Sequence, residues 1–379
     1  MPHTLPTEML TAWLRLSMTP GLGPILCQRL LSQFSTPLEV EQCTPEQLAA
    51  RVPKALCEAL LLARGEPVTQ QIVSALKWAQ HDDQFILTQD QTRYPAMLRQ
   101  IADAPIVLFA KGALSRLEQP ALAIVGARHA TVDGLEHASA FAGSLAHEGW
   151  CVISGLAQGI DAAAHRGALQ AGSIRGGTIA VLGTGADVVY PRNHAELVRR
   201  ILSEGGLIMT EFPLGTPARP HHFPRRNRIV AGLSHGVLVV EAALKSGSLL
   251  TARLAVEMDR EVFAIPGSIH SPLARGPHAL IQQGAKLVEN ATDILSELEA
   301  YCVSQTLPTP TATTDSSSKA APRSPVWDAI GYDPVSEDIL QQRTNMLPAL
   351  LQCELLTLEL NGDIERRPNG RIVRARRRS

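Results

Sequence analysis

Residues 121–128 of the chain are ALAIVGAR, an unbroken apolar run that ends at Gly126 and Arg128. Five more apolar runs of similar length follow, each continued by a helical pattern: WCVISG (150–155), TIAVLG (178–183), LIMTEF (207–212), VLVVEA (237–242) and EVFAIPG (261–267). Strands that are apolar throughout and alternate with helices are typical of a parallel sheet covered on both faces. The sequence therefore predicts an α/β fold with a doubly wound parallel sheet, in which ligands bind at the carboxyl ends of the strands.

The composition is that of a globular protein. The chain has 379 residues, 45% of them hydrophobic, which suits two or three domains with buried cores. Its formal net charge is −1, so binding to a polyanion would depend on local basic patches. The six cysteines show no paired spacing, which disfavours a disulfide framework and a zinc site, and no metal or cofactor is predicted. We find no signal segment and no apolar run long enough to span a membrane, and we expect a cytoplasmic protein.

Changes in composition divide the chain into four segments. Residues 1–80 are predicted to form a helical domain and residues 81–302 the sheet domain. Residues 303–324, rich in Thr, Ser, Pro and Ala, are predicted to be a flexible linker. Residues 325–379 contain three helical stretches and two short strands around Asn369-Gly370, a strong hairpin signal, and so predict a winged-helix-like domain.

Two features of the flanking segments leave their roles open. The segment TPGLGPI (19–25) lies between two helical patterns. Such a turn either presents backbone N–H groups to DNA or only connects two helices. The last twenty residues contain seven arginines against Asp363 and Glu365, which favours attraction to nucleic acid, although a winged helix can equally bind protein.

Small and polar residues occupy the turns after the first two strands. Gly126 and Arg128 follow the first strand, where a glycine lets backbone N–H groups approach a phosphate and an arginine can form two hydrogen bonds with it. The turn lacks two glycines of the dinucleotide-binding fingerprint, so a plain tight connection is the alternative. Asp161 and His165 lie four residues apart in SGLAQGIDAAAHRGAL (154–169). They are either an acid–base or metal-binding pair or, as we favour, a carboxylate that orients the loop and a histidine that packs.

Further polar clusters follow the later strands. Arg192 and Asn193 come after the third strand, and Asn193 is a suitable N-cap for the next helix. The helix after the fifth strand begins with donors suited to a phosphate, although capping explains the same pattern. The densest basic cluster is RPHHFPRRNRI (219–229), at the start of an apolar helix. Arginines at a helix start are often only solvated surface. Because cations at a helix N-terminus oppose the helix dipole, however, this cluster favours a bound anion, and the combined donors favour a polyanion.

Seven motifs, in this order and spacing, resemble those of the bacterial DNA-processing protein A (DprA/Smf) family: IVGAR, SGLAQGID, GTGAD..YPRN, HHFPRRNRIVAGLS, VVEA...SGSLLTA, FAIPG and GPHALIQQGAKLV. The resemblance is strong over residues 85–290. It implies an extended Rossmann domain that binds single-stranded DNA without sequence preference, flanked by an N-terminal helical domain of SAM or helix-hairpin-helix type and a C-terminal winged-helix-like domain. It also implies protection of incoming strands during natural transformation, loading of the RecA recombinase, and a homodimer.

The resemblance assigns roles to individual positions. The family's glycine-arginine turn falls on Gly126 and Arg128, its basic residue after Tyr-Pro on Arg192, and its Arg-Asn-Arg stretch on Arg226, Asn227 and Arg228. Ala127 stands where the family often has serine, which removes one possible phosphate donor. The matching positions of the dimer interface are His278 and Leu287, although an ordinary helix and edge strand would give the same pattern.

We therefore predict one DNA-binding surface at the sheet edge. Its predicted residues are Gly126, Arg128, Arg192, Asn193, His222, Phe223, Arg225, Arg226, Asn227, Arg228, Lys245, Ser246, Gly247 and Ser248. Four of the arginines, at positions 128, 192, 226 and 228, are expected to hold successive phosphates, and Asn227 to fix the loop. The nearest candidates for base stacking are His221, His222 and Phe223. Phosphate contacts should dominate in a chain that is only 4% aromatic, and the affinity should then fall steeply with salt.

Two other classes of function are weighed against DNA binding. Related Rossmann proteins hydrolyse nucleoside monophosphates with a double-glycine phosphate loop, but the corresponding segment here is KSGSLLTA and no nucleophile–base pair stands out. A dinucleotide-dependent redox protein is disfavoured by the incomplete fingerprint. We expect a binding protein rather than an enzyme, with nucleotide hydrolysis as the alternative.

Overall fold

A computed structural model describes residues 5–172, 175–302, 325–330, 335–344, 346–360, 363–366 and 371–374. The chain divides into two compact units, Met1–Thr306 and Leu307–Ser379. The predicted linker, residues 303–324, lies outside the described residues.

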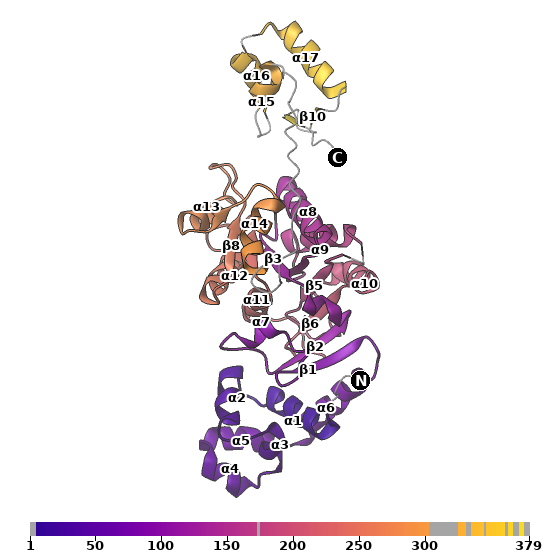
Figure 1. Cartoon of the computed structure of the whole chain (residues 1–379), viewed down its shortest axis with the longest axis vertical. Helices are drawn as coiled ribbons and strands as arrows, with labels where there is room; N and C mark the ends of the chain where they lie inside the picture. The colour runs from indigo at the N-terminus through magenta and orange to yellow at the C-terminus, as the bar shows by residue number, and fades with distance from the viewer. Residues whose placement is uncertain are drawn as a thin grey trace. The chain divides into compact units, whose positions relative to one another are not determined.

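The first unit is built on a nine-stranded sheet with the order β1-β2-β6-β5-β4-β3-β7-β8-β9. Figure 1 labels β1, β2, β6, β5, β3 and β8 of this sheet. The strands are β1 (Gln84–Thr88), β2 (Val107–Gly112), β3 (Ala121–Val125), β4 (Cys151–Ser154), β5 (Thr178–Val181), β6 (Leu207–Thr210), β7 (Gly236–Val239), β8 (Glu261–Ala264) and β9 (Lys286–Leu287). All pairs from β6 to β9 are parallel, and β3 lies between β4 and β7. Each of the six predicted runs contains one of the strands β3 to β8, so the predicted fold class is confirmed.

Strands β1 and β2, which form one edge of the sheet, were not among the predicted strands. The two strands pair antiparallel with each other, and β2 pairs antiparallel with β6. An 18-residue segment with the short helix α7 (Ala96–Arg99) separates them, and no two-residue turn marks them as a hairpin. The sheet is therefore mixed at this edge and parallel elsewhere.

Helices cover both faces of the parallel part of the sheet. One face packs against α7, α11 (His222–Gly232), α12 (Gly247–Glu257) and α13 (Arg275–Gln282). The other face packs against α8 (Val132–His147), α9 (Ile160–Gln170), α10 (Ala195–Ser203) and α14 (Ala291–Cys302). Two short 3-10 helices, η1 (Leu114–Glu118) and η2 (Arg192–His194), complete the connections. This double covering explains why the strands are apolar throughout.

Among the described residues, six helices precede the sheet, and the sequence predicts helices in this segment. They are α1 (Thr7–Met18), α2 (Pro24–Leu31), α3 (Pro37–Gln42), α4 (Pro45–Arg51), α5 (Lys54–Leu62) and α6 (Glu66–Trp78). Their buried residues form one cluster with Ile106, Val107 and Phe109 of the β1–β2 edge. The hydrophobic core of the helical segment therefore continues across residue 80 into the sheet.

The second unit contains α15 (Pro325–Ile330), α16 (Glu337–Thr344) and α17 (Pro348–Leu360), followed by β10 (Ile364–Arg366) and β11 (Ile372–Arg374). The two strands pair antiparallel, with Glu365 opposite Val373, although the turn at Asn369-Gly370 lies outside the described residues. Val326, Leu340 and Leu355 belong to its own buried core. Three helices followed by a hairpin are the arrangement that the sequence predicts. In neither unit do the described residues include a helix long and apolar enough to cross a membrane.

Candidate nucleic-acid interface

The loops after β3, β4, β5 and β7 meet at one edge of the sheet, because the carboxyl ends of parallel strands share an edge. Gly126, directly after β3, lies where the β3 loop passes closest to Ile160 and Glu241. A Cβ added at Gly126 would lie 2.5 Å from Cγ1 of Ile160 and 2.9 Å from the carbonyl oxygen of Glu241. Only glycine therefore lets the β3 loop pass between the start of α9 and the β7 loop.

A small pocket of about 100 Å³ opens at this edge. It is lined by Arg128, Gly155, Leu156, Ala157, Gln158, Tyr190, Pro191, Phe223 and Arg226. These residues come from the β3 loop, the β4 loop, the segment before η2 and the first turns of α11. The structure thus brings Arg128, Phe223 and Arg226, all predicted site residues, together around one pocket.

Arg226 is buried in the wall of the pocket, with only 4% of its surface exposed. Its Nη1 donates to the carbonyl oxygen of Val181 at 2.7 Å, whereas its buried Nε has no hydrogen-bond partner. The guanidinium lies against Gly155, where an added Cβ would be 1.8 Å from Nη1. Burial lowers the pKa of Arg226, and the nearby carboxylate of Asp161 opposes this effect. A cation fixed at the wall of a pocket is suited to receive an anion.

Asp161, in the first turn of α9, shapes the β4 loop of this pocket. Its Oδ2 accepts hydrogen bonds from the backbone N–H groups of Gly155 at 3.1 Å and Ala157 at 3.2 Å. Burial raises its pKa, and Arg226, the two backbone bonds and Arg128 oppose that shift. The prediction that Asp161 orients the loop is confirmed.

His165 is fully buried one turn later in α9. Its Nδ1 is 2.7 Å from Oγ1 of Thr178, and burial lowers its pKa to about 3. A neutral, packed histidine agrees with the reading that we favoured over an acid–base pair. Among the described residues, no three His, Cys, Asp or Glu side chains converge on a point that could hold a metal ion.

Arg128 and two aromatic rings form the outer part of the pocket. The Cζ of Arg128 is 5.7 Å from the centre of the Phe223 ring, and the rings of Phe223 and Tyr190 are 5.4 Å apart. Tyr190 is 46% exposed. Tyr190 was not among the predicted site residues, although its position in the YPRN motif, two residues before Arg192, could have indicated it. These rings offer planar surfaces on which bases can stack.

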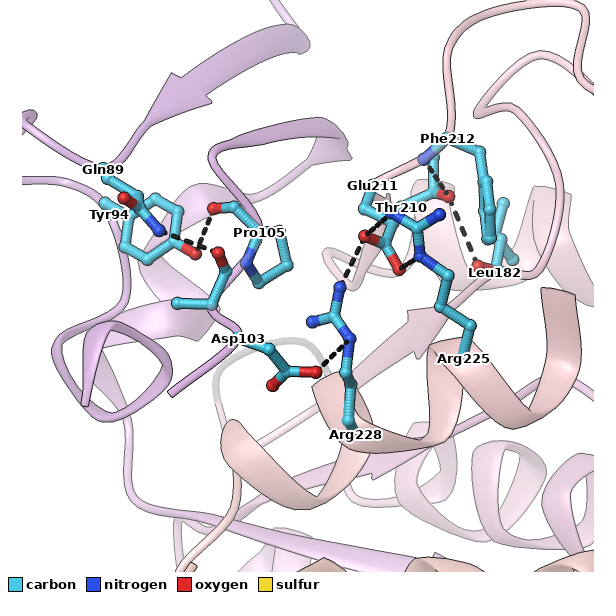
Figure 2. A network of polar contacts seen from close by, with 11 residues as sticks. Gln89, Tyr94, Asp103, Pro105, Leu182, Thr210, Glu211, Phe212, Arg225 and Arg228 are labelled. Atoms are coloured by element: carbon cyan, nitrogen blue, oxygen red, sulfur yellow. Dashed lines mark hydrogen bonds and ion pairs between the residues drawn. The ribbon is translucent and has the colours of Figure 1, made fainter. Parts of the chain in front are cut away.

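Arg228 does not line the pocket. It belongs to an ion-pair network with Glu211 and Asp103 (Figure 2). Its Nη2 is 2.6 Å from Oε2 of Glu211 and its Nε is 3.2 Å from Oδ2 of Asp103. Because residues two apart on a helix point about 200° apart, Arg226 and Arg228 lie on nearly opposite sides of α11. We therefore assign Arg228 to the packing of α11 against the β1–β2 connection, in place of the phosphate contact that the sequence suggested.

Arg225 shares the same carboxylate. Its Nε and Nη2 donate to the two oxygens of Glu211 at 3.1 and 2.9 Å (Figure 2). The Glu211 side chain is only 3% exposed, whereas that of Arg225 is 50% exposed. Arg225 therefore combines a structural ion pair with a surface that solvent and a ligand can reach.

His222 is also engaged inside the protein. It is buried, its Nδ1 is 3.1 Å from the carbonyl oxygen of Gly183, and its ring stacks on Phe212 with centroids 4.2 Å apart. Burial lowers its pKa. These contacts leave no free face for a nucleic-acid base, so among the predicted stacking residues His222 is reassigned to packing.

The start of α12 shows the capping that we offered as an alternative to phosphate binding. Ser246 is the N-cap, and its Oγ accepts from the N–H of Ser248 at 3.2 Å. The Oγ of Ser248 in turn donates to the carbonyl oxygen of Gly126 at 2.8 Å. Nδ2 of Asn227 donates to the carbonyl oxygen of Gly247 at 3.3 Å, which ties α11 to α12. These bonds order the pocket edge, and phosphate contacts from Lys245, which is exposed, stay a prediction.

Arg192 and Asn193 are both exposed in η2. Helix α10 begins at Ala195 with His194 as its N-cap, and no side chain caps it. The N-cap assignment of Asn193 was therefore wrong, because the 3-10 turn moves the start of α10 beyond Asn193. Both side chains remain available to a ligand.

The two predicted dimer residues lie on α13 and on β9, which is the edge strand at the end of the sheet away from β1. His278 on α13 has its Nε2 3.0 Å from the carbonyl oxygen of Gly267, and Leu287 on β9 is 44% exposed. An exposed apolar residue on an edge strand is compatible with a second copy of the chain, and the dimer stays a prediction.

Comparison with known proteins gives matches to family models and to individual relatives. Residues 85–299 match the model of the DNA recombination-mediator protein A family, and residues 308–370 match the DprA winged helix domain. The chain is 41% identical over 310 residues to Protein Smf of Escherichia coli (strain K12), covering 81% of this chain and 82% of the relative. It is 47% identical over 206 residues to DNA processing protein DprA of Streptococcus pneumoniae (strain ATCC BAA-255 / R6), covering 54% and 71%.

Two solved structures are similar as well. The DNA processing protein A of Streptococcus pneumoniae matches with a TM-score of 0.64 and 35% identity, covering 78% of this chain and 98% of that one. A structure of DNA processing protein A from Helicobacter pylori, described as showing its single-stranded DNA binding mode, matches with a TM-score of 0.52 and 28% identity, covering 58% and 98%.

Proposed function

The chain belongs to the DNA recombination-mediator protein A (DprA/Smf) family, and from this premise we propose that it binds single-stranded DNA at the pocket between Arg128 and Arg226. The observation that carries the proposal is the guanidinium of Arg226, which its bond to the carbonyl oxygen of Val181 holds at the pocket wall. Arg128 at the outer part supplies a second cation. A phosphate fits this combination because it accepts several hydrogen bonds and neutralises buried positive charge.

Single-stranded DNA suits the pocket better than a duplex does. Arg226 is only 4% exposed and lines a pocket of about 100 Å³, so a phosphate that contacts it has to enter this pocket. A single strand can make such local bends, and its unpaired bases can stack on Phe223 and Tyr190. The Helicobacter pylori relative named for its single-stranded DNA binding mode supports the same ligand class.

Binding should be independent of sequence. The pocket is lined by the guanidinium groups of Arg128 and Arg226, which are suited to the phosphate oxygens that every nucleotide has. Aromatic rings accept the face of any base. We therefore propose that the affinity depends on strand length and salt, and little on base composition.

We extend the proposal to the activities that the family resemblance implies. The protein would protect single strands entering by natural transformation and load RecA on them, acting in the cytoplasm as a homodimer joined through His278 and Leu287. Recovery of RecA filaments on strands coated by a single-stranded DNA-binding protein would measure the loading, and sedimentation would measure the dimer.

A binding assay tests the core of the proposal. We expect the Kd of a labelled oligo-dT to rise roughly 10- to 100-fold in Arg128→Ala, the loss of one charge-assisted contact worth about 1.5–3 kcal/mol. The matched control is Arg51→Ala, which removes an arginine whose side chain is 47% exposed on α4 and should leave the Kd unchanged. Equal affinities of the wild type and Arg128→Ala would refute the proposed site.

Nucleotide hydrolysis is the competing function. The hydroxyls of Ser246 and Ser248, at the segment that corresponds to a hydrolase phosphate loop, are used in hydrogen bonds within the protein. We therefore expect no release of free base from nucleoside monophosphates by a preparation that binds oligo-dT. Release above background that Arg128→Ala abolishes would favour the hydrolase instead.

A further inference from the structure

Helix α17 occupies the position at which helix-turn-helix proteins carry their recognition helix, directly before the hairpin of the second unit. In those proteins this helix lies in the major groove of DNA between two phosphate backbones, and cationic side chains provide most of the attraction. The thirteen residues of α17 include no Lys and no Arg, whereas they include Glu354 and Glu359. The composition of α17 is therefore unsuited to DNA.

The side of α17 that faces solvent is uncharged. Leu351, Leu355 and Leu358 are buried in the core of the unit. On the other side, Leu350 and Leu356 are 56% and 55% exposed, and Cys353 and Thr357 are exposed as well. We call these four residues the outer face of α17. A surface helix normally presents charged and polar residues to solvent, so two apolar sides indicate a second contact.

Acidic side chains flank the outer face. Glu354 lies beside Leu350 in the helical projection and makes no ion pair with any residue that the structure describes. Glu359, on the other flank, shares Arg366 with Glu337. The acidic flanks of two identical helices would repel each other. They would also repel the phosphates of a DNA backbone. A cationic partner would be attracted.

We propose that the outer face of α17 binds an amphipathic protein segment that is apolar on one side and rich in Lys or Arg at its edges. Leu350, Cys353 and Thr357 have the spacing i, i+3, i+7, which is the spacing at which helical partners place their anchors. The winged-helix unit is then a protein-docking module, and the DNA-binding pocket lies in the other unit. This inference goes beyond the proposed function and does not depend on it.

A binding experiment on the full chain tests the inference. The probe is a labelled 18-residue synthetic helix with Leu on one side and Lys on the other, and its counterpart has Glu in place of Lys. We expect the Lys peptide to bind and the double variant Leu350→Glu/Leu356→Glu to weaken it at least tenfold. Because this variant adds two negative charges, a purely electrostatic attraction would become stronger instead.

The matched control is Gln341→Glu/Gln342→Glu, which adds the same charge at two exposed positions of α16 and should preserve peptide binding. A second variant, Glu354→Lys, leaves the leucines intact and should weaken the Lys peptide while favouring the Glu peptide. Circular dichroism verifies that the variants fold, and an unchanged oligo-dT affinity separates this inference from the proposed function.

Three results would overturn the inference. The first is equal peptide affinity in the wild type and the outer-face variants. The second is a loss of duplex DNA binding in these variants without a loss of peptide binding, which would make α17 a DNA-reading helix after all. The third is a concentration-dependent self-association of the wild type that the variants abolish, which would make the partner a second copy of the chain.

Discussion

Arg226 and Gly155 depend on each other at the scale of single residues. The guanidinium occupies the space that a side chain on Gly155 would need, since an added Cβ would lie 1.8 Å from Nη1 and 2.3 Å from Cζ. Arg226 cannot swing into solvent, because it is 4% exposed and bonded to Val181. The position of the cation is thus fixed by the absence of a side chain in the β4 loop.

Gly155→Ala should therefore weaken single-stranded DNA binding almost as much as the loss of Arg226, by roughly 10-fold or more for one displaced charge-assisted contact. The control is Ser74→Ala, an exposed position of α6 outside the predicted site, and its Kd should match that of the wild type. Anisotropy titrations with oligo-dT measure both. If Gly155→Ala bound as tightly as Ser74→Ala, the pocket wall would not be part of the site.

His165 gives the fold a predictable response to acid. Burial lowers its pKa to about 3, whereas an unfolded histidine titrates near about 6.5. Between these values the unfolded chain binds a proton that the folded chain does not. The free energy of unfolding should then decrease as the pH falls below about 6.5, by about 1.4 kcal/mol per pH unit from this group alone.

Urea denaturation at pH 7.0 and pH 5.0 measures this contribution. The neutral variant His165→Gln should lose less stability than the wild type over that interval, by up to about 2 kcal/mol. Identical losses in both proteins would mean that His165 is not the group responsible.

Helix α11 joins two functions at the scale of the element. One side carries Arg226 to the pocket, and the opposite side carries Arg228 to Glu211 and Asp103. The spacing RRNR shows only that cations are concentrated there. It does not show which acidic side chain, 14 or more residues away, neutralises each of them.

Glu211→Gln should destabilise the protein, because the amide cannot neutralise Arg228, whose side chain is 7% exposed. Removing one partner of a buried pair costs about 3–5 kcal/mol, and Asp103 keeps the value near the lower end. The control Glu196→Gln breaks an exposed pair with Arg199 and should cost less than about 1 kcal/mol. Chemical denaturation compares them, and similar losses would contradict the structural role of Glu211.

The strands and the pocket differ in how far the sequence predicts them. The runs from β3 to β8 are apolar enough to be identified directly, and their carboxyl ends follow from the parallel topology. The start of α10 and the stacking of His222 on Phe212 depend on local backbone geometry, which cannot be predicted from the sequence alone. Similarly, β1 and β2 pair across 18 intervening residues without a turn signal.

The whole molecule contains two compact units, and we propose a separate task for each. The first unit holds the pocket, and its sheet shares a core with the N-terminal helices. The second unit has its own core and a helix with an uncharged outer face. The near-zero net charge fits the proposed site, which requires only a local group of cations at one sheet edge.

The most direct test of the account is the salt dependence of oligo-dT binding by the wild type and Arg128→Ala. If Arg128 neutralises a phosphate, the plot of log affinity against log salt should be steep for the wild type, and its slope should decrease in magnitude by about 0.7 in the variant. Parallel plots with equal slopes would contradict the account, because Arg128 would then release no counterion from the strand.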